Sequence, residues 1–206
     1  PKAMMPFSVE ATEQFDEILA VPTITGLDAS LSLDEQDSAV VIDANVTLAD
    51  ADGNGFGDGS LAVSIAAPDA GDRLSLATGV AHAANAIQRD GSSVQISDGS
   101  AWTTIGTIDA TDDGEGTALS ITFETGVTDA QATLVAQAIT YASVSDAPPA
   151  GPRAITFSVV SADSETAVAA ATASVSITGV SDAPTITNLD ASLSLDEQDS
   201  AVVIDA

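Results

Sequence analysis

The sequence predicts a mostly β protein, an antiparallel β-sandwich with hairpin insertions and one short helix. Three observations favour this class: apolar and polar residues alternate in several short segments, Asp-Gly pairs separate some of them, and one segment has helical spacing. Side chains of a sandwich point alternately inward and outward, so a two-residue period is typical of its strands. The segments with this period are 30–33, 39–48, 60–65, 93–97, 119–124, 154–160 and 172–180.

Glycine-containing turns connect the expected strands. Asp90-Gly91 and Asp98-Gly99 fall between alternating segments, and glycine tolerates the positive φ that tight hairpin turns require. The run DDGEG at residues 112–116 predicts a longer loop, because Asp and Gly are common turn formers. The turns therefore predict hairpin connections between neighbouring strands.

One segment, residues 128–143, has the spacing of a helix instead. It begins with Thr128, a residue type that caps helix N-termini, and it carries an apolar face. We therefore expect one helix across this segment, inserted in the sandwich. The apolar face consists of Leu134, Val135, Ala138 and Ile139.

The charge of the chain excludes two classes of partner. It has 31 acidic and 4 basic residues, a formal net charge of −27 at pH 7. Nucleic acid and anionic membranes would repel such a surface, so cations are the expected partners. Hydrophobic residues make up 45% of the chain and aromatic residues only 3%, which predicts an aliphatic core. The sequence has no cysteine, and no apolar run long enough for membrane insertion.

A long repeat divides the chain. Residues 22–44 and 184–206 have the same sequence, except that Gly26 in the first is replaced by Asn188 in the second. Near-identity over this length suggests a tandem array, and the spacing is too long for a solenoid, so each unit is expected to be a whole domain. The expected parts are a helical leader at 1–21, one full unit at 22–183, and the first strands of a further unit at 184–206.

An acidic loop, LADADGNGFGDG at residues 48–59, has the spacing of a calcium site. Calcium takes about six to eight oxygen ligands, and this loop offers one at every second residue, as an EF-hand loop does. Leu61 stands where an EF-hand has its bidentate glutamate, so a strong ligand must come from elsewhere. The alternative is a soluble turn. The candidate ligands are Asp50, Asp52, Asn54, Phe56 through its carbonyl, and Asp58.

Strand direction places further acids at the two ends of the sandwich. The first strand should carry Glu35 and Asp37 away from the end at which the chain enters, and the next strand should return the acidic loop to it. The turn with Asp163 and Glu165 is expected beside that loop, and Asp182 beside Glu35. Calcium at each junction would then join acids of one unit to the loop of the next. The equivalents of Glu35 and Asp37 in the second repeat, and further candidate ligands, are Glu197 and Asp199.

Three short motifs occur together in the unit. They are Asp50-Ala-Asp52 followed by Asn54-Gly55, Leu33-Asp-Glu35-Gln, and Val180-Ser-Asp182-Ala-Pro184. The first is similar to the DxD loop of cadherins, the second to the acidic motif early in a cadherin domain, and the third to the linker between domains. The family's linker usually has asparagine where this chain has Ser181.

Together the motifs resemble the cadherin-like repeats of large RTX-type bacterial surface adhesins, which are exported by type I secretion. The resemblance spans most of residues 22–184 and implies an Ig-like or cadherin-like sandwich. Segments 71–76 and 137–159 also resemble parts of these repeats. The unit is longer than a typical cadherin domain, so the hairpins between residues 80 and 110 and the helix would be insertions.

The resemblance implies a non-enzymatic structural module of a secreted adhesin or extracellular matrix fibre at the bacterial cell surface, rigidified by calcium. Its partners would be adjacent repeats of the same chain. The alternative is a self-assembling filament or surface-layer subunit, in which residues 184–206 supply strands to a like chain.

An enzyme is the third possibility, and no residue is predicted to be catalytic. Acids are abundant, but a catalytic pair needs a pocket and two different pKa values, which sequence does not reveal. His82, the only histidine, is expected in a turn or at the surface. Trp102 and Tyr141 are expected in the core.

Overall fold

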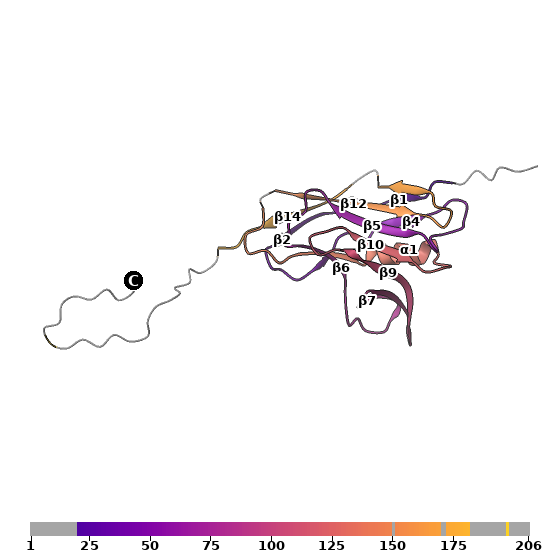
Figure 1. Ribbon diagram of the computed structural model, residues 1–206, viewed down its shortest axis with the longest axis horizontal. Helices are drawn as coiled ribbons and strands as arrows, with labels where there is room; N and C mark the ends of the chain where they lie inside the picture. The colour runs from indigo at the N-terminus through magenta and orange to yellow at the C-terminus, as the bar shows by residue number, and fades with distance from the viewer. Residues whose placement is uncertain (1–19, 150, 170–171, 182–196, 198–206) are drawn as a thin grey trace, which may run out of the picture.

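The computed structural model describes residues 20–149, 151–169, 172–181 and 197. These residues form a β-sandwich with fourteen strands and one helix, which confirms the predicted fold class (Figure 1). Hydrogen bonds arrange the strands in sheets of nine, three and two. The elements are β1 (Thr23–Thr25), β2 (Ser30–Asp34), β3 (Val40–Val41), β4 (Thr47–Ala49), β5 (Ser60–Ile65), β6 (Asp72–Leu76), β7 (Ala84–Asp90), β8 (Ser93–Asp98), β9 (Trp102–Asp113), β10 (Leu119–Phe123), α1 (Asp129–Gln137), β11 (Ile139–Ser143), β12 (Arg153–Val160), β13 (Thr166–Val168) and β14 (Ala173–Thr178).

The core is one continuous cluster between the sheets. Strands β5, β10 and β12 form the middle of the nine-stranded sheet, and buried side chains recur at every second residue along them. Along β12 this alternation is regular, with Ile155, Phe157 and Val159 fully buried. Most core residues are aliphatic, as the composition predicts, and their removal from water is the main contribution to folding.

The chain enters and leaves the sandwich at opposite ends of its long axis (Figure 1). β1 pairs with β4 near one end, and β2 and β14 lie together toward the other. We call the end at which β4 finishes the N-terminal pole, and the end at which β14 finishes the C-terminal pole. This arrangement places the acidic loop, which follows β4, at the N-terminal pole.

One strand pair departs from the predicted antiparallel arrangement. β2 pairs with β14 in parallel, with Ser30 opposite Ser174 and Asp34 opposite Thr178. The other pairs between described strands are antiparallel. The reason is that β2 begins the passage from the N-terminal to the C-terminal pole and β14 completes it, so both run in the same direction.

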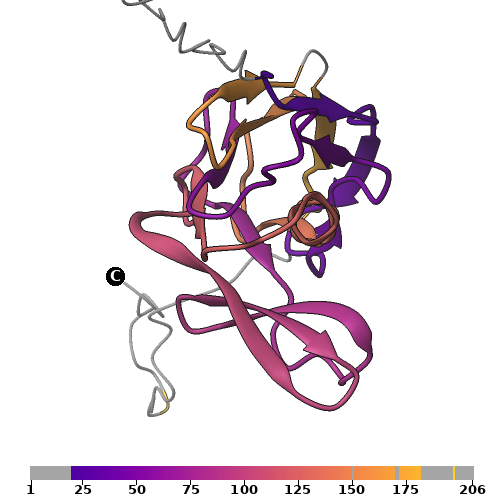
Figure 2. The ribbon, with the colours of Figure 1, turned by 90° about the vertical axis from the view of Figure 1, so that its right-hand side faces the viewer.

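β7, β8 and the first half of β9 form an arm that projects from the sandwich (Figure 2). β9 serves both parts, because Gly106 lies opposite Val94 in the arm and opposite Phe123 of β10 in the sandwich. Gly91 and Gly99 have φ of +60° and +97° in the turns on either side of β8, which confirms the two predicted hairpin turns. The loop predicted at 112–116 begins later, because its first two residues belong to β9.

The alternating segment 39–48 forms two strands rather than the single one predicted. β3 joins the three-stranded sheet, whereas β4 pairs with β1. The break lies at the buried Asp43, whose carboxylate accepts N–H bonds from Asp28, Ala29 and Asn45 at 2.8–3.1 Å. Such side-chain bonds compete with strand pairing for backbone groups, so the chain turns here from one sheet to the other.

The predicted helix is right at its start and wrong at its end. α1 begins after its N-cap Thr128, which forms a capping box, but it ends at Gln137. The following residues form β11, the central strand of the three-stranded sheet, and its first three residues are buried one after another. Consecutive burial suits a strand covered on both faces better than the single stripe of a helix. Isoleucine, threonine and tyrosine also favour strands, so tertiary burial decides the structure.

Five strands lie outside the predicted alternating segments, namely β1, β6, β7, β9 and β13. Of these, β7 and the first part of β9 fall between residues 80 and 110, where hairpins were expected. β1 and β13 have only three residues each, and β7 shows no regular alternation of buried and exposed side chains. The predicted helical leader and the second repeat lie outside the described residues, apart from residues 20 and 21 and Glu197. Within the described part of the chain, no helix is long and apolar enough to cross a lipid bilayer.

Candidate cation site

Asp50 is buried because it continues the inward face of β4. Side chains at alternate positions of a strand point the same way, so Val46, Leu48 and Asp50 face the interior together. Val46 and Leu48 are in the core, and Asp50 is only 5% exposed. The strand thus carries a carboxylate into the end of the sandwich. A buried charge there destabilises the folded protein unless it has a partner.

Three acids converge at the N-terminal pole. One carboxylate oxygen each from Asp50, Asp52 and Asp163 lies within 4.8 Å of the others. Asp163 comes from the turn between β12 and β13, and its Oδ2 accepts a bond from Nδ2 of Asn54 at 2.6 Å. The backbone joins the same two segments, because the N–H of Ala162 donates to the carbonyl of Gly55 at 3.0 Å. The expected position of Asp163 beside the acidic loop is therefore found.

A fourth acid, Asp129, lies next to this group and was not predicted from the sequence. It is the first residue of α1, and its Oδ2 accepts the N–H of Asp50 at 3.0 Å. In the sequence Asp129 follows a capping threonine, so it resembles an ordinary acidic residue of a first helical turn. Only the packing of α1 against β4 distinguishes it, and no local pattern signals that contact.

The converging carboxylates have unused oxygens. Among the described residues, five buried side-chain oxygens find no hydrogen-bond partner, and four of them belong to these acids: both of Asp50, and one each of Asp52 and Asp129. Buried polar atoms in proteins are nearly always bonded, and each exception calls for an explanation. Four acidic oxygens without hydrogen-bond partners, close together, are typical of the residues that bind a cation.

The pKa values of the two acids of the DxD motif move in opposite directions. Burial, followed by the neighbouring carboxylates of Asp52, Asp129 and Asp163, raises the pKa of Asp50 from 3.8 to about 6. The N–H of Ala20 donates to Oδ2 of Asp52 at 2.9 Å and is the main cause that lowers the pKa of Asp52. Asp50 thus holds its negative charge at a cost, whereas Asp52 is stabilised as an anion by the chain that enters the domain.

The second half of the acidic loop is directed elsewhere. The ring of Phe56 packs in the core edge-to-face with Phe123, with centroids 6.5 Å apart, and its carbonyl accepts the N–H of Gly59. The exposed Asp58 accepts a bond from the hydroxyl of Thr125 at 2.8 Å. The structure therefore does not bring these two predicted ligands into the acidic group, and the loop does not wrap one centre as an EF-hand loop does.

Glycine is required where the loop approaches its neighbours. Gly55 has a φ of +74°, and a Cβ there would lie 2.9 Å from the carbonyl oxygen of Val127. A Cβ on Gly57 would lie 2.4 Å from the amide nitrogen of Gly126. The glycines of LADADGNGFGDG thus allow Phe56 to enter the core while the first half of the loop stays at the acids.

Glu35 lies at the C-terminal pole, as the strand directions predict. It is 7% exposed, its Oε1 accepts the N–H of Val180 at 2.9 Å, and its Oε2 has no partner in the described part of the chain. The carboxylate of Asp37 instead accepts the N–H of Asp34 at 3.0 Å. Glu165 shares the turn of Asp163 and exchanges bonds with Ser161, but its carboxylate is not in the acidic group. Of the remaining predicted ligands, Asp182 and Asp199 lie outside the described residues, and Glu197 is exposed in a turn.

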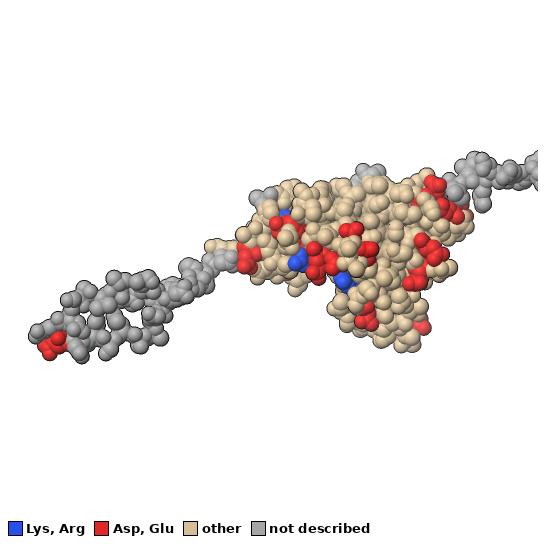
Figure 3. Space-filling model, viewed as in Figure 1, with Lys and Arg blue, Asp and Glu red and all other residues tan. Residues whose placement is uncertain are grey.

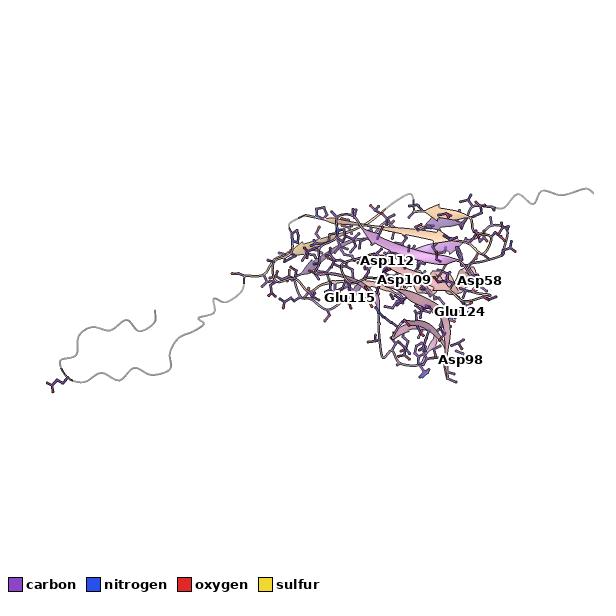
Figure 4. The ribbon with its side chains drawn as sticks, in the orientation of Figure 1. Asp58, Asp98, Asp109, Asp112, Glu115 and Glu124 are labelled. Carbon is purple, nitrogen blue, oxygen red and sulfur yellow. The ribbon has the colours of Figure 1, made fainter. Side chains whose placement is uncertain are left out.

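Many other acids lie spread over the surface, where they stabilise turns or contact solvent (Figure 3). Figure 4 labels six of them, from Glu115 and Asp112 to Asp98 on the arm, and they do not converge on one point. Oδ1 of Asp98 accepts the N–H groups of Ser100 and Ala101 at 2.7 and 2.8 Å, and the Ala101 bond is the main cause that lowers its pKa. Asp109 is similar, because the hydroxyl and N–H of Thr111 donate to it and lower its pKa.

The aromatic residues considered for binding have different positions. Tyr141 is in the core, as predicted, and its hydroxyl donates to Oδ1 of Asp72 at 2.5 Å. Burial raises the pKa of Tyr141, and the same Asp72 oxygen accepts a bond from Nε of Arg153 at 2.7 Å. The prediction for Trp102 is wrong, because it is half-buried on the arm and packs on the exposed His82, with ring centroids 4.9 Å apart.

Comparison of the chain with models of protein families, with curated proteins and with solved structures finds no match in any of the three. The function proposed below therefore rests on the geometry of the site and on the sequence.

Proposed function

We propose that the protein is a non-enzymatic structural module that Ca²⁺ stiffens at its N-terminal pole. The observation that carries this proposal is the carboxylate of Asp50, which is buried, unpaired within the described residues, and surrounded by three further acids. A carboxylate in such a place is destabilising unless a cation or a proton compensates it. The residues therefore fit a cation, and the acids supply its negative charge.

The chemistry of the donors favours calcium. Every candidate ligand offers oxygen: four carboxylates, Asp50, Asp52, Asp129 and Asp163, and the side-chain amide of Asn54. Zinc prefers nitrogen or sulfur, and the only histidine of the chain, His82, packs against Trp102 of the arm. Magnesium demands a regular octahedron, whereas calcium accepts irregular sets of oxygen ligands with water filling the rest.

The connectivity of the site supports a mechanical role. Its acids come from the loop after β4, the start of α1 and the turn after β12, which are far apart in the sequence. Asp52 also holds the N–H of Ala20, the first described residue of the chain that enters the domain. A cation at these acids would tie the entering chain to three parts of the sandwich, and the exit at the opposite pole would continue a rigid array.

We infer an extracellular location from this chemistry. Calcium modules outside cells bind at roughly 0.1–1 mM, which suits a site with exposed and partly buried acids. A tandem array of such units, indicated by the repeat of residues 22–44 at 184–206, suits a surface adhesin or matrix fibre. Its partners would be the neighbouring units of the same chain.

Three cavities among the described residues have at most one acid in their lining. A cavity of 480 Å³ between β4, α1 and Asn85 has Asp129 as its one carboxylate, and a neighbouring one of 270 Å³ has Asp98. A third, of 200 Å³, has no acid in its lining. A glycoside hydrolase needs two carboxylates across one substrate, and none of these three cavities supplies the pair.

Calcium binding and local rigidity test this proposal directly. Isothermal titration of calcium and magnesium into the metal-free chain should give binding for calcium, and Asp50→Asn should abolish it, whereas the arm variant Asp98→Asn should not. Hydrogen exchange at the Ala20 amide should slow when calcium is added, because its acceptor Asp52 becomes fixed. Absence of calcium binding at millimolar concentration, or binding that Asp50→Asn leaves unchanged, would refute the site.

A filament subunit is the second candidate, and one observation favours it. β2, with the sequence SLSLD, forms the edge of the nine-stranded sheet, and residues 192–196 have the same sequence. A second chain therefore carries a segment whose side chains suit the place of β2 beside β14. Light scattering should then show assembly that deletion of residues 184–206 abolishes. Assembly of the shortened chain to the same size would exclude strand donation.

A further inference from the structure

Helix α1 lies along the free edge of β4 and bonds to its backbone through side chains. Asp129, Thr133 and Gln137 are spaced four residues apart, so they lie on one face of the helix. Oδ2 of Asp129 accepts the N–H of Asp50 at 3.0 Å, and Nε2 of Gln137 donates to the carbonyl of Val46 at 3.0 Å. Between them, Oγ1 of Thr133 accepts the N–H of Leu48 at 3.0 Å and donates to its carbonyl at 3.1 Å.

The regular spacing has a geometric cause. Four residues of an α-helix rise about 6 Å, and two residues of a β-strand rise about 6.6 Å, so every fourth helical side chain meets every second strand residue. In an antiparallel pair, the backbone groups of alternate residues point to opposite edges. Leu48 lies opposite Ile24 of β1, and its N–H and carbonyl bond to Thr133. The backbone groups of Val46, Leu48 and Asp50 therefore face the other edge, where α1 lies. The helix face thus takes the place of a neighbouring strand.

The contacts fix α1 in one register on β4. A shift by one helical residue would turn all three side chains away from the strand, and the N–H groups of Leu48 and Asp50 would lose their acceptors. A buried backbone N–H without an acceptor is destabilising, so the observed register is strongly preferred. Asp129, at the N-terminal end of the helix, is the member of this row that lies at the N-terminal pole, where it is one of the four acids.

We propose that α1 is the positioning element of the cation site, with Thr133 and Gln137 holding Asp129 in place as its fourth acid. This inference rests on the proposed function. Neither positioning residue touches the acidic group: Gln137 lies two helical turns, about 12 Å, from Asp129 along the helix axis. Occupancy of the site and the docking of α1 on β4 then stabilise each other, and the two effects must be equal because binding linkage is reciprocal.

The test compares calcium affinity with the exposure of the β4 edge. Thr133→Val removes both bonds to Leu48 while keeping the shape of the side chain, and Gln137→Ala removes the distant bond to Val46. Each should weaken calcium binding in isothermal titration, by about 5-fold or more, which is the usual lower range of coupling between sites. In the unaltered chain, calcium should slow hydrogen exchange of the Leu48 and Asp50 amides, and Thr133→Val should reduce that protection.

Two further variants control for indirect effects. Thr133→Ser keeps the hydroxyl and should restore calcium affinity close to that of the unaltered chain. Thr122→Val removes a hydroxyl from an exposed position on β10 and should change neither affinity nor exchange at β4. Gln137→Ala supplies the test if Thr133→Val does not fold.

The possible outcomes separate this inference from the proposed function. Calcium binding that is unchanged in both Thr133→Val and Gln137→Ala would overturn the positioning role and leave the cation site intact. A chain that binds no divalent cation at all would overturn the proposed function and this coupling with it. Reduced affinity in both variants with restoration by Thr133→Ser would support the inference.

Discussion

The acids of the arm and the acids of the N-terminal pole have the same side chains in similar sequences, yet their surroundings are opposite. Asp98 precedes a glycine in a hairpin turn, is exposed, and accepts two backbone N–H bonds that lower its pKa. Asp50 precedes a glycine-rich loop, is 5% exposed, and accepts no bond from the described residues, and burial raises its pKa to about 6. Backbone N–H groups thus compensate the charge of Asp98. The charge of Asp50 has no such donors, so it is available to a cation.

The difference arises from strand geometry rather than from composition. Asp98 ends β8 at a turn whose N–H groups point at its carboxylate. Asp50 ends β4 on the side that faces the core, and the turns around it contribute further acids instead of donors. Acids next to glycines therefore stabilise a turn where the chain reverses on the surface. They form a candidate ion site where a strand directs a carboxylate inward.

The largest effect should come from a third kind of acid, which is buried and fully partnered. Asp72 is as deeply buried as Asp50, but Arg153 and Tyr141 bond to it. Asp72→Ala leaves Arg153 as an unpaired buried charge and should cost about 3–5 kcal/mol in urea unfolding, with or without calcium. A loss below about 1 kcal/mol would show that pairing does not distinguish the two buried acids.

The next effect concerns pH and has the opposite sign. The pKa of Asp50 is 3.8 in the unfolded chain and about 6 in the folded protein, so the metal-free fold binds the proton more tightly than the unfolded chain. The contribution of Asp50 to stability should be fully present below its unfolded pKa of 3.8 and be lost as pH rises through about 6. At neutral pH, Asp50→Asn should stabilise the metal-free protein by about 1–3 kcal/mol, the lower figure allowing for solvent screening.

Urea unfolding of metal-free protein between pH 4 and pH 8 measures this difference. The variant Asp50→Asn should lack the loss of stability that the unaltered chain shows, while Asp98→Asn should retain it. A parallel decline in the unaltered chain and in Asp50→Asn would mean that another group is responsible.

Calcium should have a smaller effect on stability. A cation at ten times its dissociation constant stabilises the folded state by about 1.4 kcal/mol. The melting temperature of the unaltered chain should rise on addition of calcium and fall again with a chelator. Asp50→Asn and Asp163→Asn should lose this response, and an equal response in all variants would place the ion elsewhere.

The smallest effect is expected on the arm. Asp98→Ala removes the acceptor of the Ser100 and Ala101 amides, so hydrogen exchange at these two amides should accelerate. Because the pKa of Asp98 is lowered, its contribution is present above the unfolded pKa of 3.8 and is lost as pH falls. Calcium affinity should not change, and a weaker affinity would mean that the arm communicates with the pole.

Local patterns were sufficient for the fold class and for part of the site. Alternation predicts β5, β8, β10, β12 and β14 within one or two residues, and strand direction places Asp163 beside the acidic loop and Glu35 at the C-terminal pole. The helix end at Gln137 could not be predicted, because burial of the next segment between two strands decides it. The same holds for Asp129, whose role depends on a contact between α1 and β4 rather than on any spacing.

The parallel pairing of β2 and β14 has a consequence for a protein under tension. A pull on the two ends of the described domain draws the start of β2 toward one pole and the end of β14 toward the other, so the strands are sheared along their length. The evenly spaced bonds across five residue pairs must then yield together, whereas a hairpin pulled at its open end releases its bonds one at a time. This strand arrangement therefore predicts that the domain resists stretching along its long axis.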